Sequence, residues 1–362
     1  MKIKMYNCGF GDCFRITTTP ERNLFVDFGG DKRQAIDDIG KDSAFLLTHF
    51  HEDHFENAMN IGTRDNKFKE VYIPDVWDVQ TCTDVVALLL MDSKINSKMS
   101  VMDFLLKVCD VNSGSIHFVR RGSRIEKDFI ALWPCRDYLV ARAKEIMTEV
   151  IRDIMLCAEE QRELPFDVDE VRAIASQLIQ SVSHYVERPQ AEAFWEELKS
   201  LKCEYDRLKV ALPKNKMVGY QLSNFGNLIS IVFQNALPCE QNVLFLGDFG
   251  KSKGAWELME SNSGVKMHKT YSDIKIPHHG TPAYYHSFVK YFSQNEYQPT
   301  TIYIPNGCHR RKNWRIYERY SKDVNSVPRT ISQCTNNDTC NAATPNCQCR
   351  WPRIVCFQGE AL

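Results

Sequence analysis

The chain has 362 residues and a formal net charge of -1, so it lacks the global basic field of many nucleic-acid-binding proteins. Hydrophobic residues make up 43% of it and charged residues 25%, which is ordinary for a globular protein large enough to fold without disulfides. No apolar run is long enough to span a bilayer, and the segment Met1–Tyr6 lacks the apolar block of a signal peptide. We therefore expect a cytoplasmic protein with no membrane association, whose 14 cysteines are mostly reduced thiols.

The first third of the chain alternates short apolar segments with polar turns, and amphipathic stretches follow. This alternation of strands with helices is typical of a layered α/β domain. Strands are expected at Lys2–Tyr6, Cys13–Thr17, Leu24–Val26, Ala44–Thr48, Val71–Pro74, Ile116–Val119 and Phe129–Pro134, and helices at Arg33–Ile39, Asp84–Met91 and Val101–Cys109.

From about Arg136 to Leu212 the pattern becomes almost entirely helical. Three successive stretches carry apolar residues at helical spacing; Asp167 with Glu170 forms a plausible capping box for the second, and Pro189 suits the start of the third. The sequence therefore predicts a helical insertion over residues 136–216. This block is as consistent with packing or with a homodimer or other protein-contact surface as with a substrate lid.

Strand patterns return in the last part of the chain. They are expected at Leu228–Phe233, Val243–Leu246, Asp273–Ile276, Thr301–Ile304 and Arg353–Phe357.

The strand expected at Ala44–Thr48 leads directly into a dense group of metal-binding residue types. His49, His51, Asp53 and His54 offer three imidazoles and a carboxylate, which are ligands that zinc, iron and manganese accept. A strand end holds its ligands rigidly, and the following turn lets Asp53 and His54 face a second ion. The sequence therefore predicts a site for two divalent ions, with zinc expected first and manganese or iron as alternatives.

One loop cannot complete two metal sites, and the strand ends farther along the chain supply more ligands. A carboxylate between two cations can bridge them, and this is the role expected for Asp248, which ends a strand. His279 is the better ligand candidate of the next pair, and His278 is a candidate for substrate contact. Asp27 ends yet another strand and is expected to orient a ligating histidine through its ring N–H.

Together these motifs resemble the metallo-β-lactamase superfamily, in particular its ComEC-like branch. The motifs are His49-x-His51-x-Asp53-His54, Gly247-Asp248 and Pro277-His278-His279-Gly280, supported by Gly9-Phe10-Gly11-Asp12-Cys13, Asn227-Leu228-Ile229-Ser230 and Leu132-Trp133-Pro134. The resemblance covers about residues 1–135 and 217–362. The helical block 136–216 and the Cys-rich tail have no counterpart in it.

The resemblance implies an αββα metallo-β-lactamase sandwich made of residues 1–135 and 217–362, with the helical insertion 136–216 and a Cys-rich C-terminal segment. It assigns His49 and His51 to a first metal, and Asp53, His54 and His279 to a second, with Asp248 as the bridge. The third histidine usual for the first metal is where this sequence departs. His117 lies in the right interval, but its setting inside a strand predicts a structural role instead.

A water between two divalent ions ionises near neutral pH and can attack as hydroxide. Asp53 is expected to orient this nucleophile, and His278 or His309 to donate a proton to the leaving group. Arg310, within a short basic run, could receive a phosphate, although such a run is more often solvated surface. A metallo-hydrolase of phosphodiesters, including nucleic acid, is the leading hypothesis. Hydrolysis of carboxylic esters, lactones or amides, and a metal-bound partner-binding module with little catalysis, stay open.

The C-terminal segment contains a further group of cysteines. It could hold a third, structural zinc ion, but free thiols in a hairpin are the favoured interpretation, because the spacings are not those of a standard zinc knuckle. The residues are Cys334, Cys340, Cys347, Cys349 and Cys356.

Overall fold

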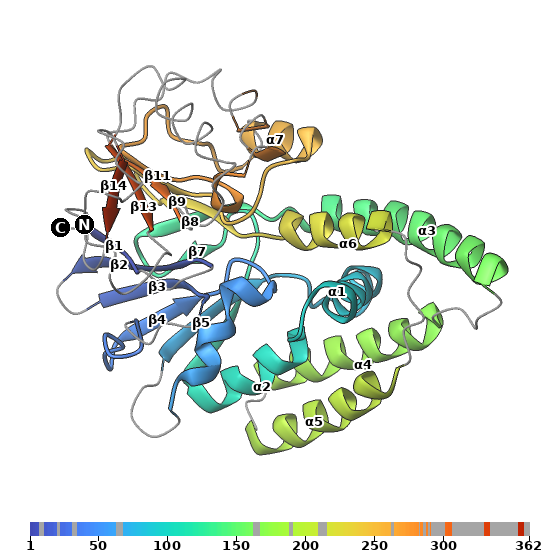
Figure 1. Cartoon of the computed structure of the whole chain (residues 1–362). Coiled ribbons are helices and arrows are strands. Elements are labelled where there is room, and N and C mark those ends of the chain that lie inside the picture. Colours follow the sequence, from blue (N-terminus) through green and yellow to red (C-terminus); the bar gives the residue numbers. More distant parts are fainter. Residues whose placement is uncertain are drawn as a thin grey trace, which may run out of the picture.

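Two mixed β-sheets pack face to face in the computed structural model, and helices lie against their outer surfaces (Figure 1). This layering makes the chain an α/β protein compatible with the expected αββα sandwich. The structure describes residues 1–6, 11–19, 22–30, 35–62, 68–161, 167–187, 191–208, 216–261, 264–281, 283–284, 287–288, 290, 301–305, 329–333 and 354–357.

The first sheet follows the chain order and carries the histidine-rich loop. Its first strands pair antiparallel, and from the third strand onward all neighbours are parallel. In the described part of the chain its strands are β1 (Lys2–Met5), β2 (Cys13–Thr19), β3 (Arg22–Phe28), β4 (Ser43–Leu46), β5 (Phe68–Pro74) and β6 (Asn112–Val119).

The second sheet collects strands from the rest of the described chain, in the order β14-β13-β12-β11-β10-β9-β8-β7. Strands β10 to β14 run parallel to one another, and β7 to β10 pair antiparallel. The bounds are β7 (Arg124–Ile125), β8 (Phe129–Trp133), β9 (Val232–Asn235), β10 (Val243–Phe245), β11 (Asp273–Lys275), β12 (Thr301–Ile304), β13 (Arg329–Gln333) and β14 (Ile354–Phe357).

Alternation along the strands builds two separate cores. Side chains of successive strand residues point to opposite faces. Phe25 and Phe45 therefore join the core beneath the helices, whereas Val26 belongs to the core between the sheets. There Phe14 of β2 meets Phe245 of β10 edge to face, with ring centroids 5.3 Å apart. The apolar strands are buried on both faces, so each sheet is held in position by packing on its two sides.

The helices of the described chain lie mostly on the side of the first sheet. Helix α1 is central, because it contacts α2, α3, α4 and α6. The helices are α1 (Thr83–Asn96), α2 (Val101–Val111), α3 (Arg136–Gln161), α4 (Val168–Glu187), α5 (Ala191–Arg207), α6 (Lys216–Leu228) and α7 (Lys253–Glu260), with short 3-10 turns η2 (Glu52–His54), η3 (Glu56–Asn60) and η4 (His278–Gly280). No described helix is both long and apolar enough to cross a membrane.

The long helical stretch agrees with α3, α4 and α5, but its end was misplaced by the sequence pattern. Helix α6 continues the helical part to Leu228, so the strand expected at Leu228–Phe233 was wrong in its first half. The apolar run of that segment is buried at the end of a helix and in the turn after it, and buried helix and buried strand cannot be distinguished by hydrophobicity alone. Most of the helix expected at Arg33–Ile39 is not present: residues 36–38 form turns, and residues 33–34 lie outside the described residues.

Candidate metal centre

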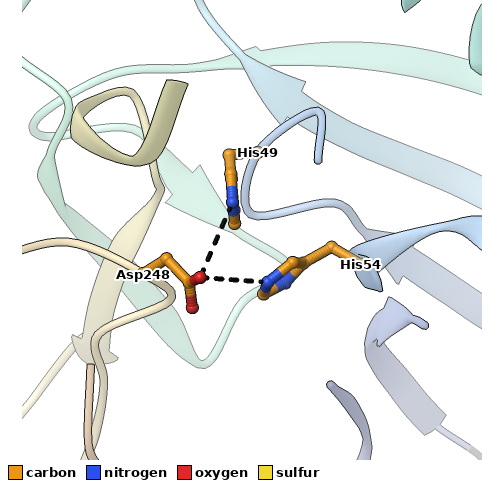
Figure 2. A group of neighbouring side chains, drawn as sticks. All are labelled: His49, His54 and Asp248. Carbon is orange, nitrogen blue, oxygen red and sulfur yellow. Dashed lines mark ion pairs between the residues drawn. The ribbon is translucent and has the colours of Figure 1, made fainter. Parts of the chain in front are cut away.

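Loops that leave the carboxyl ends of parallel strands bring the acidic and histidine side chains together. The segment 48–54 follows β4, Asp248 follows β10, and His278 with His279 follows β11. The parallel strands β10 and β11 end at the same edge of the second sheet, and the loop after β4 of the first sheet meets their loops there. Figure 2 shows His49 and His54, from the loop after β4, and Asp248, from the loop after β10, pointing toward one another.

Asp248 is the centre of the cluster. Its Oδ2 lies 2.9 Å from Nδ1 of His278, 3.4 Å from Nε2 of His54, 3.7 Å from Nε2 of His279 and 3.9 Å from Nε2 of His49. The Asp248 side chain is 1% exposed. A buried carboxylate surrounded by four imidazoles is suited to bridging cations, because it can offer one oxygen to each.

Asp27 holds His54 in place from behind. Its Oδ2 lies 2.8 Å from Nδ1 of His54, and the same carboxylate accepts hydrogen bonds from the backbone N–H of Thr48 at 2.7 Å and from the Thr48 hydroxyl at 2.8 Å. The Thr48 hydroxyl also lies 3.2 Å from Nδ1 of His49. Both rings are therefore anchored through Nδ1, and Nε2 is left facing the cluster. This is the arrangement by which a second layer of residues orients metal ligands.

Asp53 and Asp12 enclose His279. The Nε2 of His279 lies 3.0 Å from Oδ2 of Asp53, and its Nδ1 lies 2.9 Å from Oδ1 of Asp12. Asp12 was not expected from the sequence, although the Gly9–Cys13 turn that contains it was noticed. The sequence feature that could have indicated Asp12 is an aspartate directly after a glycine turn.

Glycine at two positions lets the chain bearing Asp53 approach the N-terminal turn. A Cβ on Gly11 would lie 2.1 Å from the carbonyl oxygen of Asp53, and one on Gly29 would lie 1.7 Å from the same atom. That carbonyl accepts the N–H of Asp12 at 3.1 Å. No side chain fits between these segments, so the close approach requires glycine at both positions.

Lys275 is a buried cation beneath the cluster. Its Nζ pairs with Oδ2 of Asp12, lies 3.6 Å from Oδ1 of Asp248, and donates to the carbonyl of Gly247 at 2.7 Å. Its side chain is 2% exposed. The sequence reasoning missed it, because an alternating strand gave no indication that one of its lysines is buried. The positive charge balances part of the carboxylate excess at this edge.

His51 lies next to His49, with ring centroids 4.6 Å apart, and its Nε2 faces helix α1. Its Nε2 lies 2.9 Å from Oδ2 of Asp92 in α1, whose side chain is 6% exposed. Gly226 of α6 packs against this pair, since a Cβ there would lie 2.4 Å from the Nε2 of His51. Nδ1 is therefore the His51 nitrogen left for a metal. Asp92 was also missed, although an acidic residue within the apolar run of α1 was a usable signal.

His278 occupies the side of the cluster next to a tyrosine and an asparagine. The ring stacks on Tyr284 with centroids 4.2 Å apart and planes 5° from parallel, and its Nδ1 lies 3.2 Å from the amide nitrogen of Asn227. His278 and His279 both have positive φ, 46° and 51°. Non-glycine residues adopt this conformation at a cost, and such strain persists where packing imposes it, commonly at functional sites.

Burial and neighbouring charges shift the pKa values of the cluster residues strongly, and in different directions. Burial would lower the pKa of His54 and His279, but the surrounding carboxylates outweigh it, raising that of His54 well above its usual range and that of His279 to about 10. Burial would raise the pKa of Asp248, yet the imidazolium charges around it hold that pKa well below its usual range. Burial and the charges of neighbouring histidines lower the pKa of His49 well below its usual value, so His49 is a neutral imidazole. Carboxylates that hold protons on adjacent imidazoles mark a site that attracts cations.

The donor set fits divalent metal ions. Nε2 of His49, Nε2 of His54 and Oδ1 of Asp248 are buried without a hydrogen-bond partner among the described residues. Buried polar atoms are rarely left so, and here both imidazole nitrogens face the Asp248 carboxylate. Four overlapping groups could hold one or two ions: His49, His54 and Asp248; Asp53, His54 and His279; Asp12, Asp27 and His54; and Asp12, Asp248 and His279.

The remaining sequence candidates lie elsewhere. His117 pairs with Glu70 at 2.6 Å and stacks on Tyr72, and it belongs to none of the candidate metal groups in the described part of the chain. His309, Arg310 and the cysteines 334, 340, 347 and 349 lie outside the described residues; Cys356 falls in β14, and the structure describes nothing of its side chain.

A comparison of the chain with known protein-family models finds no match, and a comparison with curated protein sequences finds none either.

Proposed function

We propose that this protein is a metal-dependent hydrolase of phosphodiesters, built on a metallo-β-lactamase fold. The observation that carries the proposal is the buried Asp248, which is surrounded by His49, His54, His278 and His279. Among the described residues, Nε2 of His49 and of His54 have no hydrogen-bond partner. A purely structural role does not account for several imidazoles and carboxylates gathered in the interior, because burying such groups costs free energy unless a cation or a reaction uses them.

Two divalent ions, zinc first and manganese or iron as alternatives, would be held by His49, His51, Asp53, His54 and His279, with Asp248 between them. Ions bound there would acidify a water and stabilise negative charge on the oxygen of the scissile bond. The chain's own groups orient these ligands: Asp27 and Thr48 fix His54, and Asp92 fixes His51.

The cluster side chains that are open enough to meet a substrate are Asp53, His278 and His51, of which His51 is 20% exposed and pairs with Asp92. Asp53 is 19% exposed and His278 is 23% exposed, whereas Asp248 is 1% exposed. We assign to Asp53 the role of orienting the attacking water, and to His278 that of exchanging a proton with the leaving group. Burial lowers the pKa of His278, which favours the neutral form of its ring.

The choice of phosphodiesters rests on the resemblance of the histidine and aspartate motifs to the ComEC-like branch. The same fold class supports hydrolysis of other esters, so the substrate must be established by assay. Residues 1–135 and 217–362 would form the catalytic sandwich, with 136–216 inserted between them.

The test uses Asp53→Ala and Asp248→Ala on the full chain loaded with zinc or manganese. Hydrolysis of bis(p-nitrophenyl) phosphate should depend on added metal and should be lost in both variants, together with bound metal measured by elemental analysis. Asp169→Ala is the control, because that side chain is 90% exposed on α4. Hydrolysis that survives both cluster substitutions would refute the metal mechanism, and a wild-type protein that cleaves no phosphodiester would refute the substrate.

A further inference from the structure

A pocket of about 380 Å³ lies beside the metal centre, between α3 and α6. Its walls come from these two helices, from the loop 250–252 and from Tyr284. The lining is mixed: Phe225 and Ile146 are apolar, whereas Lys251 and Asn224 are polar. This volume and this composition are those of a site for a small organic molecule.

One layer of side chains joins the pocket to the metal centre. Asn227 and Tyr284 line the pocket, and both contact His278, whose Nδ1 lies 2.9 Å from Asp248. The amide nitrogen of Asn227 also donates to the Tyr284 hydroxyl at 2.7 Å. A molecule in the pocket would thus place one end near His278 and the candidate metal ligands.

Lys251 is held in the pocket wall by neutral partners. Its Nζ donates to the Tyr220 hydroxyl and to Oδ1 of Asn224, both at 2.9 Å, and lies 4.7 Å from the ring centroid of Tyr284. In the described part of the chain no carboxylate pairs with this ammonium. The other cation of the pocket, Arg142, is paired with Glu145. The pocket therefore presents one positive charge that lacks a counter-ion.

Asn227 supplies a second, independent sign of a ligand. The residue is 3% exposed, and its Oδ1 is buried with no hydrogen-bond partner among the described residues. A buried acceptor without a partner costs about 1–3 kcal/mol in general, and a donor on a bound molecule would remove that cost.

We propose that this pocket binds the organic part of the substrate and that Lys251 binds a second anionic group on it, so that the substrate is a small organic phosphodiester carrying an additional negative charge. The proposal rests on the proposed function. A pocket of this size admits one small group and not a length of nucleic acid. Helix α3 accordingly forms one wall of the substrate site, which favours the substrate-lid alternative for the first helix of the 136–216 block.

The kinetic test compares two thymidine dinucleotides, with and without a terminal phosphate, on the metal-loaded full chain. The wild type should prefer the phosphorylated dinucleotide in kcat/KM by about tenfold, the effect of one charge-assisted hydrogen bond of about 1.4 kcal/mol. Lys251→Gln should remove this preference. Lys253→Gln is the matched control, since that lysine is 67% exposed and pairs with Glu257 on α7. A preference that Lys251→Gln leaves intact, or faster cleavage of a long thymidine oligonucleotide than of either dinucleotide, would overturn the proposal.

A second variant fills the pocket. Ala141 lines it from α3 and is exposed, so Ala141→Trp can be accommodated without disturbing the core. We expect a raised KM for both dinucleotides with an unchanged circular dichroism spectrum. An unchanged KM for both would show that substrate does not enter there.

Binding of phenylphosphonate, a non-hydrolysable aromatic anion, separates this proposal from the proposed function. Isothermal titration calorimetry on the metal-loaded protein should give about tenfold weaker binding in Lys251→Gln than in the wild type. If this loss is seen but no phosphodiester is cleaved, the pocket stands and the hydrolase falls. If cleavage occurs but neither binding nor preference responds to Lys251, the hydrolase stands and the pocket assignment falls.

Discussion

The two ends of the histidine and aspartate cluster contain different kinds of candidate metal ligands. At one end, His279 lies between Asp53 and Asp12 at 3.0 Å and 2.9 Å, and Asp248 is close by. At the other end, His49 lies 3.9 Å from Asp248, and its neighbour His51 pairs with Asp92 instead. The first end offers several carboxylates to a cation, whereas the second offers mainly imidazole.

This difference is visible in the protonation of the rings. Carboxylates overcome burial and raise the pKa of His279 to about 10, whereas burial and neighbouring histidine charges lower that of His49 well below its usual value. Negative charge attracts a divalent ion over a longer range than neutral imidazole does. We therefore expect one ion to bind tightly at the His279 end and a second ion to bind more weakly at the His49 end.

The largest expected effect comes from removing one imidazole at each end. His279→Ala should weaken the tighter ion by about a thousandfold, or roughly 4 kcal/mol, because it takes away a ligand held by two carboxylates. His49→Ala should weaken the looser ion and leave the tighter one nearly unchanged. Isothermal titration of chelator-treated protein with zinc or manganese measures both constants. Equal losses in the two variants would abolish the distinction between the ends.

The next effect concerns the buried cation at the His279 end. Lys275→Met should lower the free energy of unfolding of the metal-free protein by about 3 kcal/mol, because Asp12 and Asp248 are left buried without their cation. Added metal should restore part of this loss. Urea denaturation with and without metal gives both values. The control is Lys69→Met, whose side chain and that of its partner Asp42 are both 61% exposed, and a similar loss there would contradict the assigned role.

A smaller effect is expected from Asp92, which acts through His51. Asp92→Ala should weaken the looser ion by about thirtyfold, within the range typical of residues that orient metal ligands. Asp92→Asn should retain most of the metal affinity, because an amide oxygen can still accept a hydrogen bond from the ring N–H of His51. Asp84→Ala, in the same helix but paired with Arg172, is the matched control. No rescue by Asn would indicate that the charge of Asp92, and not its position, is what matters.

The strand-end residues of the cluster could be predicted, and their partners could not. Asp248, His278 and His279 each follow an apolar strand, and parallel strands bring such ends together without any further information. Asp12, Asp92 and Lys275 reach the cluster from a turn, a helix interior and the last position of strand β11. Their contacts are set by tertiary packing, so local patterns carried no more than a hint of them.

Helix α6 shows why part of the fold escaped prediction. Gly219 and Gly226 weaken its helix propensity, and the apolar segment around Leu228 looks like a strand. Yet a side chain at position 226 would collide with His51. The site therefore requires Gly226, the same residue that made the helix hard to predict. Glycine lowers the helix propensity at position 226 but allows the contact between α6 and His51. A single sequence does not show such a long-range contact.

The smallest expected effect concerns Asp38, a partly exposed carboxylate that lies outside the cluster. Burial would raise the pKa of Asp38, but hydrogen bonds from Lys4 and Tyr6 and the charge of Arg15 outweigh it and lower that pKa. A carboxylate with a lowered folded-state pKa stabilises the protein above its unfolded pKa, and that stability is lost as the pH falls through the folded pKa. Because Asp38 is 28% exposed and screened by solvent, Asp38→Asn should cost less than about 1 kcal/mol at neutral pH and nothing at pH values below the folded pKa. Urea denaturation of both proteins across the acid range measures this difference. A loss at neutral pH as large as that of Lys275→Met would mean that burial is not what separates the metal centre from ordinary surface ion pairs.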